Sequence, residues 1–133
     1  MTRIIAEESF IHYNREKGAD MQTAEFFENL EFDDRHVVVT PMLESGFTKE
    51  IRIAFKAGQL MKAHKTAYPI TVMVLRGEID FGLPEKSVTL KSGDLIALEP
   101  NVIHSLEAKE ESVVRLSLSK QDTIKRVNAV LNL

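Results

Sequence analysis

Short runs of alternating apolar and polar residues recur along the chain from residue 36 to residue 118. In the clearest run, residues 49–56, Ile51 and Phe55 fall on one face while Glu50 and Arg52 fall on the other. A period of two is the pattern of a β-strand with one buried face. Turn-forming residues separate the runs at roughly eight- to twelve-residue intervals, which is typical of a sandwich or closed barrel. The predicted strands cover residues 36–43, 49–56, 61–75 (one strand or a pair), 78–81, 88–90, 95–98, 102–108 and 113–118.

Helical spacing of apolar residues occurs near the two ends of the chain. Residues 21–30 place three apolar side chains on one helical face, and Asp20 is available to cap the first turn. Residues 120–132 carry a second apolar stripe, made of Ile124, Val127, Val130 and Leu131. We therefore expect an all-β core with a short N-terminal helix and a C-terminal helix.

Length, charge and cysteine content narrow the class of protein. A chain of 133 residues can build one core and is too short for two ordinary domains, so we treat residues 1–133 as one domain with a barrel core at 36–118. The net charge of -3 is scattered, and no basic cluster indicates nucleic acid binding. Without cysteine, neither disulfides nor thiolate metal ligands are possible. We see no signal peptide or membrane-spanning run, and expect a cytoplasmic protein without nucleic acid or membrane partners.

Two strand-like segments each carry one histidine. Residues 58–77 contain His64, and residues 93–104 end in His104. Side chains alternate faces along a strand, so an inward His64 takes residues of the same parity with it, provided Tyr68 and Pro69 do not shift the register. We predict that the two histidines face one shared, partly apolar cavity. Its candidate lining residues are His64, Thr66, Tyr68, Ile70, Val72 and His104.

The first segment resembles the first motif of the cupin superfamily. That motif reads glycine, five residues, His-any-His, three or four residues, glutamate, six residues and glycine. Gly58, His64 and Gly77 match it, whereas Thr66 takes the place of the second histidine. The glutamate position falls on Ile70 with the shorter spacer; with the longer one it falls on Thr71, which leaves too few residues before the closing glycine.

The second segment is similar to the second cupin motif, a glycine, a proline and a histidine. Gly93, Pro100 and His104 meet it with slightly shortened spacing. The resemblance covers residues 37–118 and implies a double-stranded β-helix, or jelly-roll barrel, like that of small RmlC-like cupins. It also implies a homodimer, whose contact could come from residues 36–39 as an edge strand or from the C-terminal apolar stripe.

The departures from the first motif bear on metal binding. Metal-binding cupins hold a divalent ion with three histidines and one glutamate, of which only His64 and His104 are present here. With only two imidazole ligands, a bound ion would depend on water for its other ligands. The resemblance therefore implies Zn, Fe, Mn or Ni at low occupancy at most, and the missing ligands favour a protein without bound metal. Glu50 has no counterpart among the family ligands, and Glu107 falls on the strand face opposite His104.

Four further residues have competing interpretations. His12 and His36 lie outside the motifs, and we expect them to be surface or capping histidines. Tyr68 stands where the family often has a loop at the barrel mouth, and it either covers the pocket or simply packs. Arg52 would be an anion-binding residue if it pointed into the barrel, but we expect it to point away, toward solvent or an interface.

Three functions remain open from the sequence. The retained barrel framework with its missing ligands favours a small-molecule binding or sensing module. The two retained histidines leave a metal-dependent enzyme, an isomerase or a dioxygenase-like protein, as the alternative. A structural or interaction role through a homodimer is the third. No serine or carboxylate partner forms a triad with either histidine, so we assign no catalytic residue, and the sequence does not identify the ligand.

Overall fold

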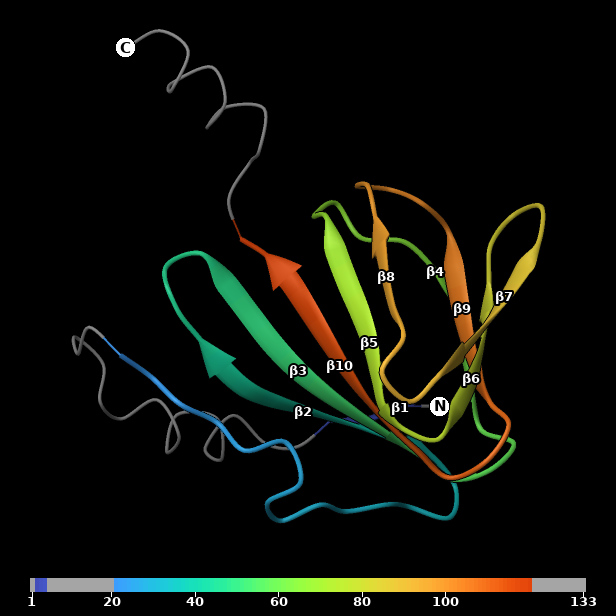
Figure 1. The fold of residues 1–133 in the computed structure, drawn as a ribbon, viewed down its shortest axis with the longest axis horizontal. Coiled ribbons are helices and arrows are strands. Elements are labelled where there is room, and N and C mark those ends of the chain that lie inside the picture. The colour runs from blue at the N-terminus through green and yellow to red at the C-terminus, as the bar shows by residue number, and fades with distance from the viewer. Residues whose placement is uncertain (1, 5–20, 121–133) are drawn as a thin grey trace, which may run out of the picture.

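The computed structural model describes residues 2–4 and 21–120, which form ten β-strands in two sheets (Figure 1). The predicted all-β class is confirmed, and the apolar run at residues 61–75 is a pair of strands. The strands are β1 (Thr2–Ile4), β2 (Val37–Glu44), β3 (Thr48–Phe55), β4 (Leu60–His64), β5 (Ile70–Arg76), β6 (Glu78–Gly82), β7 (Ser87–Lys91), β8 (Leu95–Leu98), β9 (His104–Ala108) and β10 (Ser112–Ser119).

The two sheets face each other across an apolar interior. The larger has the order β1-β2-β3-β10-β5-β8 and the smaller the order β4-β9-β6-β7, and all pairs are antiparallel except β1 with β2. Each fully buried aliphatic or aromatic side chain contributes about 1.5–3 kcal/mol, so this interior is the main source of stability. The buried core residues are Val37, Ile53, Phe55, Ile70, Val72, Val74, Ile79, Phe81, Leu90, Leu106, Ala108 and Val114.

β3 shows both faces of the larger sheet. Ile53 and Phe55 point into the core, as their alternation predicts. Arg52 lies on the opposite face, as expected, but it is only 3% exposed rather than solvated. Its guanidinium donates from Nη1 to the carbonyl oxygens of Phe26 (3.2 Å) and Glu28 (2.9 Å). The segment before β2 therefore lies against the outer face of this sheet.

The prediction of a short helix at residues 21–30 is wrong. This segment has no helix, and its only regular feature is a turn at residues 26–29. Asn29 adopts a positive φ of 53°, which ends a right-handed turn, and its carbonyl oxygen accepts from Arg52 Nη2 at 3.3 Å. Local spacing suggested a helix, but the segment instead lies against β3, where Arg52 binds the carbonyl groups of three of its residues.

Two other expectations concern the chain ends. Residues 36–39 were expected as an edge strand, but β1 pairs with β2 from Thr2↔Val37 to Ile4↔Val39, so β2 is an interior strand. His12 and the predicted C-terminal helix lie outside the described residues, apart from Lys120. Within the described residues, no helix is long and apolar enough to cross a membrane.

Gly77 carries the chain from β5 in one sheet to β6 in the other. It has a φ of 100°, which side-chain-bearing residues rarely adopt. A Cβ at this position would stand 2.2 Å from Ser112 Oγ and 2.5 Å from the carbonyl oxygen of Glu111. The backbone at Gly77 must pass close to Ser112, because the Ser112 hydroxyl accepts from the amide of the next residue, Glu78, at 3.0 Å. The same hydroxyl donates to the carbonyl of Glu110 at 2.7 Å. The second glycine of the first motif is thus required by the crossing between sheets.

Candidate functional site

The structure brings the two motif histidines together across the β4–β9 pair. Met61 of β4 stands opposite Leu106 of β9, and His64 stands opposite His104. β4 therefore has one more residue than β9 between these two pairs, which is a β-bulge. Because of the extra residue, Met61 and His64 can both face the interior side, which strict alternation would forbid.

The imidazole rings of His64 and His104 are in contact. Their centroids lie 4.4 Å apart with the planes tilted by 56°. On its other side, His104 stacks on Phe81 of β6, with centroids 5.6 Å apart and planes within 2° of parallel. Phe81 was not among the candidate site residues. Its alternation with Ile79 in β6 marks it as inward-facing, but nothing local shows that it meets His104.

Each histidine has one ring nitrogen fixed by its own strand. Nδ1 of His64 lies 2.8 Å from the carbonyl oxygen of Lys62, and Nδ1 of His104 lies 2.8 Å from that of Val102. A carbonyl oxygen only accepts, so each Nδ1 carries the hydrogen, and in a neutral ring the Nε2 atom then carries a lone pair. The two histidines form a pair of hydrogen-bond acceptors.

His104 is buried and His64 is exposed. Burial lowers the pKa of His104, the hydrogen bond to Val102 partly opposes this, and the nearby His64 lowers it further. His104 is nevertheless not sealed off. Four side-chain polar atoms of the described residues are buried without a hydrogen-bond partner, and neither histidine contributes one. The Nε2 atom of His104, for which no partner is found, therefore keeps contact with solvent although the residue is only 3% exposed.

Two loops meet beside the histidines. The amide of Asn101, in the loop before β9, donates to the carbonyl oxygen of Thr66, in the loop after β4, at 2.8 Å. Asn101 has a φ of 69°, in the left-handed region that asparagine tolerates. Tyr68 and Ile103, on these loops, are 44% and 48% exposed. Each of the two loops thus carries one exposed apolar side chain.

The other predicted lining residues take different places. Ile70 and Val72 are buried in the core, as their inward parity predicts, so they belong to the packed interior. Thr66 accepts a hydrogen bond from the amide of Tyr68 at 3.1 Å, which shapes the loop. Of the predicted lining residues, the structure brings His64 and His104 together, and the cavity itself stays a prediction.

These residues do not fit the four-ligand metal centre of metal-binding cupins. Ile70 has no donor atom, and the hydroxyl oxygen of Thr66 is engaged by the loop. Within residues 2–4 and 21–120, no group of three or more histidine, aspartate or glutamate side chains is placed to hold a metal ion. We derive no chemistry through a bound metal.

Neither glutamate considered as a substitute ligand joins the site. Glu50 lies on the outer face of the larger sheet, where its Oε1 accepts from Arg115 Nε at 2.8 Å and from Ser117 Oγ at 2.6 Å. Burial raises the pKa of Glu50, but the hydrogen bonds from Arg115, Ser117 and Thr48 outweigh it, so the net pKa is lowered. Glu107 is exposed, 3.9 Å from Lys109 Nζ, on the face opposite His104, as predicted.

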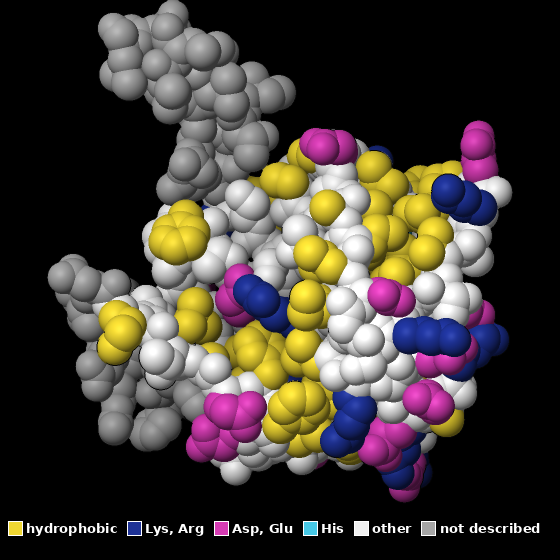
Figure 2. Space-filling model, viewed as in Figure 1, with side chains coloured by type: hydrophobic (Ala, Val, Ile, Leu, Met, Phe, Trp, Pro, Cys, Tyr) yellow, Lys and Arg dark blue, Asp and Glu magenta, His cyan; other side chains and the backbone are white. Residues whose placement is uncertain are grey.

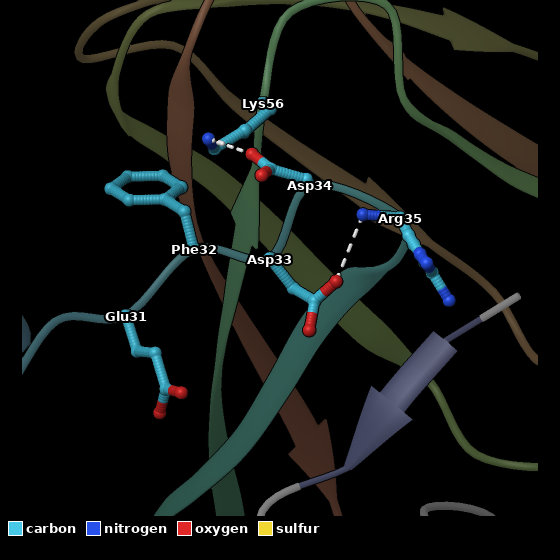
Figure 3. Close-up of a pocket in the computed structure, with 6 residues that line it drawn as sticks. All are labelled: Glu31, Phe32, Asp33, Asp34, Arg35 and Lys56. Carbon is cyan, nitrogen blue, oxygen red and sulfur yellow. Dashed lines mark hydrogen bonds and ion pairs between the residues drawn. The ribbon is translucent and has the colours of Figure 1, made fainter.

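A separate groove of about 570 Å³ lies between residues 31–35 and Lys56 (Figure 3). Three of its charged side chains are already engaged. Asp34 pairs with Lys56, and the Asp33 carboxylate accepts from the amide of Arg35 at 2.8 Å. These exposed contacts order the loop before β2 and contribute little energy, so we assign the groove no function.

Charges of both signs are interspersed on the molecular face seen in Figure 2. Lysine and arginine side chains lie next to aspartate and glutamate side chains over much of the described surface in this view, without a broad basic area. This face therefore offers no electrostatic footprint for nucleic acid.

Comparison with known proteins identifies the fold. No family model matches the sequence, and no curated protein matches it. An RmlC-like cupin protein from Desulfovibrio desulfuricans is 24% identical and superposes with a TM-score of 0.69, covering 74% of this chain and 96% of that one. A cupin superfamily protein from Desulfitobacterium hafniense is 13% identical, with a TM-score of 0.66 over 77% and 94% of the two chains.

A third similar structure is described as a double-stranded β-helix. An RmlC-like cupin from Methanocaldococcus jannaschii with a double-stranded β-helix fold is 17% identical, with a TM-score of 0.62 over 84% of this chain and 99% of that one. The chain therefore has the double-stranded β-helix fold of the RmlC-like cupins, and the fold implied by the motif resemblance is confirmed. At these identities the likeness concerns the fold alone, so function must be argued from the site.

Proposed function

We propose that the protein is a small-molecule binding or sensing module whose ligand contacts His64 and His104. One observation carries this proposal: the two rings lie 4.4 Å apart, beside loops that carry the exposed Tyr68 and Ile103. Among the described residues, none provides a hydrogen-bond partner for either Nε2 atom; His64 is exposed, and Nε2 of His104 keeps contact with solvent, so both acceptors are open to a ligand. A bound ligand could donate to both atoms in place of water.

The test compares untagged protein, purified without chelator, with a His64→Ala/His104→Ala double variant. Metal content and bound small molecules are measured by elemental analysis and native mass spectrometry. Ser87→Ala is the control, because it changes an exposed position on β7, a strand that pairs with neither β4 nor β9. We expect little metal, and a ligand that wild type and control retain and the double variant loses. Ligand binding that survives in the double variant would contradict the proposed site.

A metal-dependent enzyme is the second candidate, because the same two acceptor nitrogens suit a divalent ion. Zn, Fe, Mn or Ni at one equivalent per chain, lost in the double variant, would replace our proposal with this one. Substoichiometric metal that is unchanged by the double substitution would count against it.

We also propose that the protein is a homodimer, as the resemblance to small cupins implies. Light scattering at micromolar concentration should give twice the 15.0 kDa mass of the chain. A species of the chain mass under these conditions would refute the dimer and leave the ligand site untouched.

A further inference from the structure

The acceptor character of the histidine pair restricts the ligand, if the proposed function holds. Each Nδ1 atom donates to a carbonyl oxygen of its own chain two residues earlier, at 2.8 Å in both cases. The same short-range geometry thus fixes the same tautomer in both rings. Two lone pairs, on rings 4.4 Å apart, are therefore within reach of one small molecule.

An anionic group matches these nitrogens poorly. Carboxylate and phosphate oxygens accept hydrogen bonds, so they would face lone pairs unless a histidine became protonated. A protonated His104 would carry its charge in a buried position, against the ring of Phe81 and beside His64. Both conditions disfavour the charged form.

Among the described residues, no carboxylate acts on His104, so a cationic group finds no countercharge from them. Glu107 points to the opposite face of β9, and Glu50 is bound to Arg115 on the outer face of the other sheet. Two exposed lysines, Lys62 and Lys65, lie within two residues of His64 in the sequence, and their positive charge would not favour a cationic ligand. An ammonium group at the pair would lose water without gaining a carboxylate partner.

Neutral hydroxyl groups match the site. A hydroxyl donates to a lone pair without bringing charge into a partly buried site. The ring of Phe81, stacked on His104, is the apolar group that the structure places beside the pair. From the orientation of the two rings, we infer that the ligand is a neutral polyhydroxylated molecule whose hydroxyl groups donate to Nε2 of His64 and of His104.

The first test needs no ligand. Nitrogen-15 NMR of the histidine side chains at neutral pH reports which ring nitrogen carries hydrogen. We expect Nδ1–H with an unprotonated Nε2 in both His64 and His104. An Nε2–H tautomer in either ring would overturn the inference about ligand class, while the proposed binding site could still stand.

The second test uses probes with one ring and different head groups: cis-1,2-cyclohexanediol, cyclohexanecarboxylate and cyclohexylamine. We expect the diol to shift the Nε2 signals of both histidines and to bind about tenfold more tightly than the other two. His64→Phe should abolish diol binding. Lys62→Ala is the matched control: it keeps the carbonyl that orients His64 and should leave diol binding unchanged.

The outcomes separate the two proposals. Preferred binding of the carboxylate, weakened by Lys62→Ala, or preferred binding of the amine would overturn the hydroxyl inference and leave the proposed function standing. If no probe shifts either histidine and the protein holds stoichiometric metal, both the inference and the proposed function fail.

Discussion

His64 and His104 are direct cross-strand partners, and their pairing depends on one extra residue in β4. Without the bulge, the register that begins at Met61↔Leu106 would place Ala63 opposite His104. The site then would hold one histidine. The bulge thus changes a single buried histidine into a pair of acceptors, on which the proposed function rests.

The first prediction concerns pH. Because the pKa of His104 is lowered in the folded protein, the unfolded chain, with a histidine pKa of about 6.5, binds more protons at mildly acidic pH. The free energy of unfolding should therefore fall as the pH drops below about 6.5 and continue to fall until the folded-state pKa is reached. Urea denaturation at a series of pH values measures this dependence of the free energy of unfolding on pH.

The control for this prediction is His104→Gln, which should lose the pH-dependent component between neutrality and the carboxylate range. His64→Ala should in addition raise the pKa of His104, measured by NMR titration, since His64 is one of the groups that lower it. An unchanged pH profile in His104→Gln would show that another group is responsible.

The second prediction concerns the buried carboxylate of Glu50. Glu50→Ala leaves the Arg115, Ser117 and Thr48 donors without their acceptor and should cost about 1–3 kcal/mol in urea denaturation. The pKa of Glu50 is lowered from 4.5, so its contribution is present above that pH and is lost as the pH falls through the folded-state value. The difference in the free energy of unfolding between Glu50→Ala and wild type should therefore shrink as the pH falls through this range. Glu110→Ala, at an exposed position, should be nearly neutral.

The third prediction concerns the crossing between the sheets. Gly77→Ala should destabilise the protein by more than about 2 kcal/mol, because the new Cβ meets Ser112 and Glu111 and the backbone has a positive φ. Gly46→Ala is the matched control, since nothing lies within 4 Å of a Cβ there. Equal thermal stability of the two variants would contradict this explanation of Gly77.

The fourth prediction concerns the segment before β2. Arg52→Ala should cost about 2–3 kcal/mol and speed amide hydrogen exchange at residues 21–30 more than in β5, because three backbone carbonyl groups lose their charged donor. Arg35→Ala removes the same type of side chain from an exposed position and should leave exchange unchanged. Uniform acceleration across the sheet would indicate global rather than local loss of structure.

Much of the fold could be predicted from the sequence. Strict alternation identified β3, and the same parity placed Ile70, Val72 and Leu106 inside. The apolar spacing at residues 21–30 predicted a helix, but the segment is held against β3 by Arg52, a long-range contact that local spacing does not encode. The candidate site was predictable only in part: the two motif histidines were recognised, whereas Phe81, Asn101 and Ile103 carry no local signal of their role.

The sequence by itself determined which residues favour extended structure, which faces are apolar and which metal ligands are missing, because these depend on composition and local periodicity. The tertiary structure alone decided that His64 meets His104, that Phe81 stacks behind it and that both Nε2 atoms are acceptors. Register and bulges follow from hydrogen bonds between strands distant in sequence, whose relative energies no local pattern encodes. The tautomers follow from hydrogen bonds two residues apart, whose geometry depends on the backbone path that the fold sets.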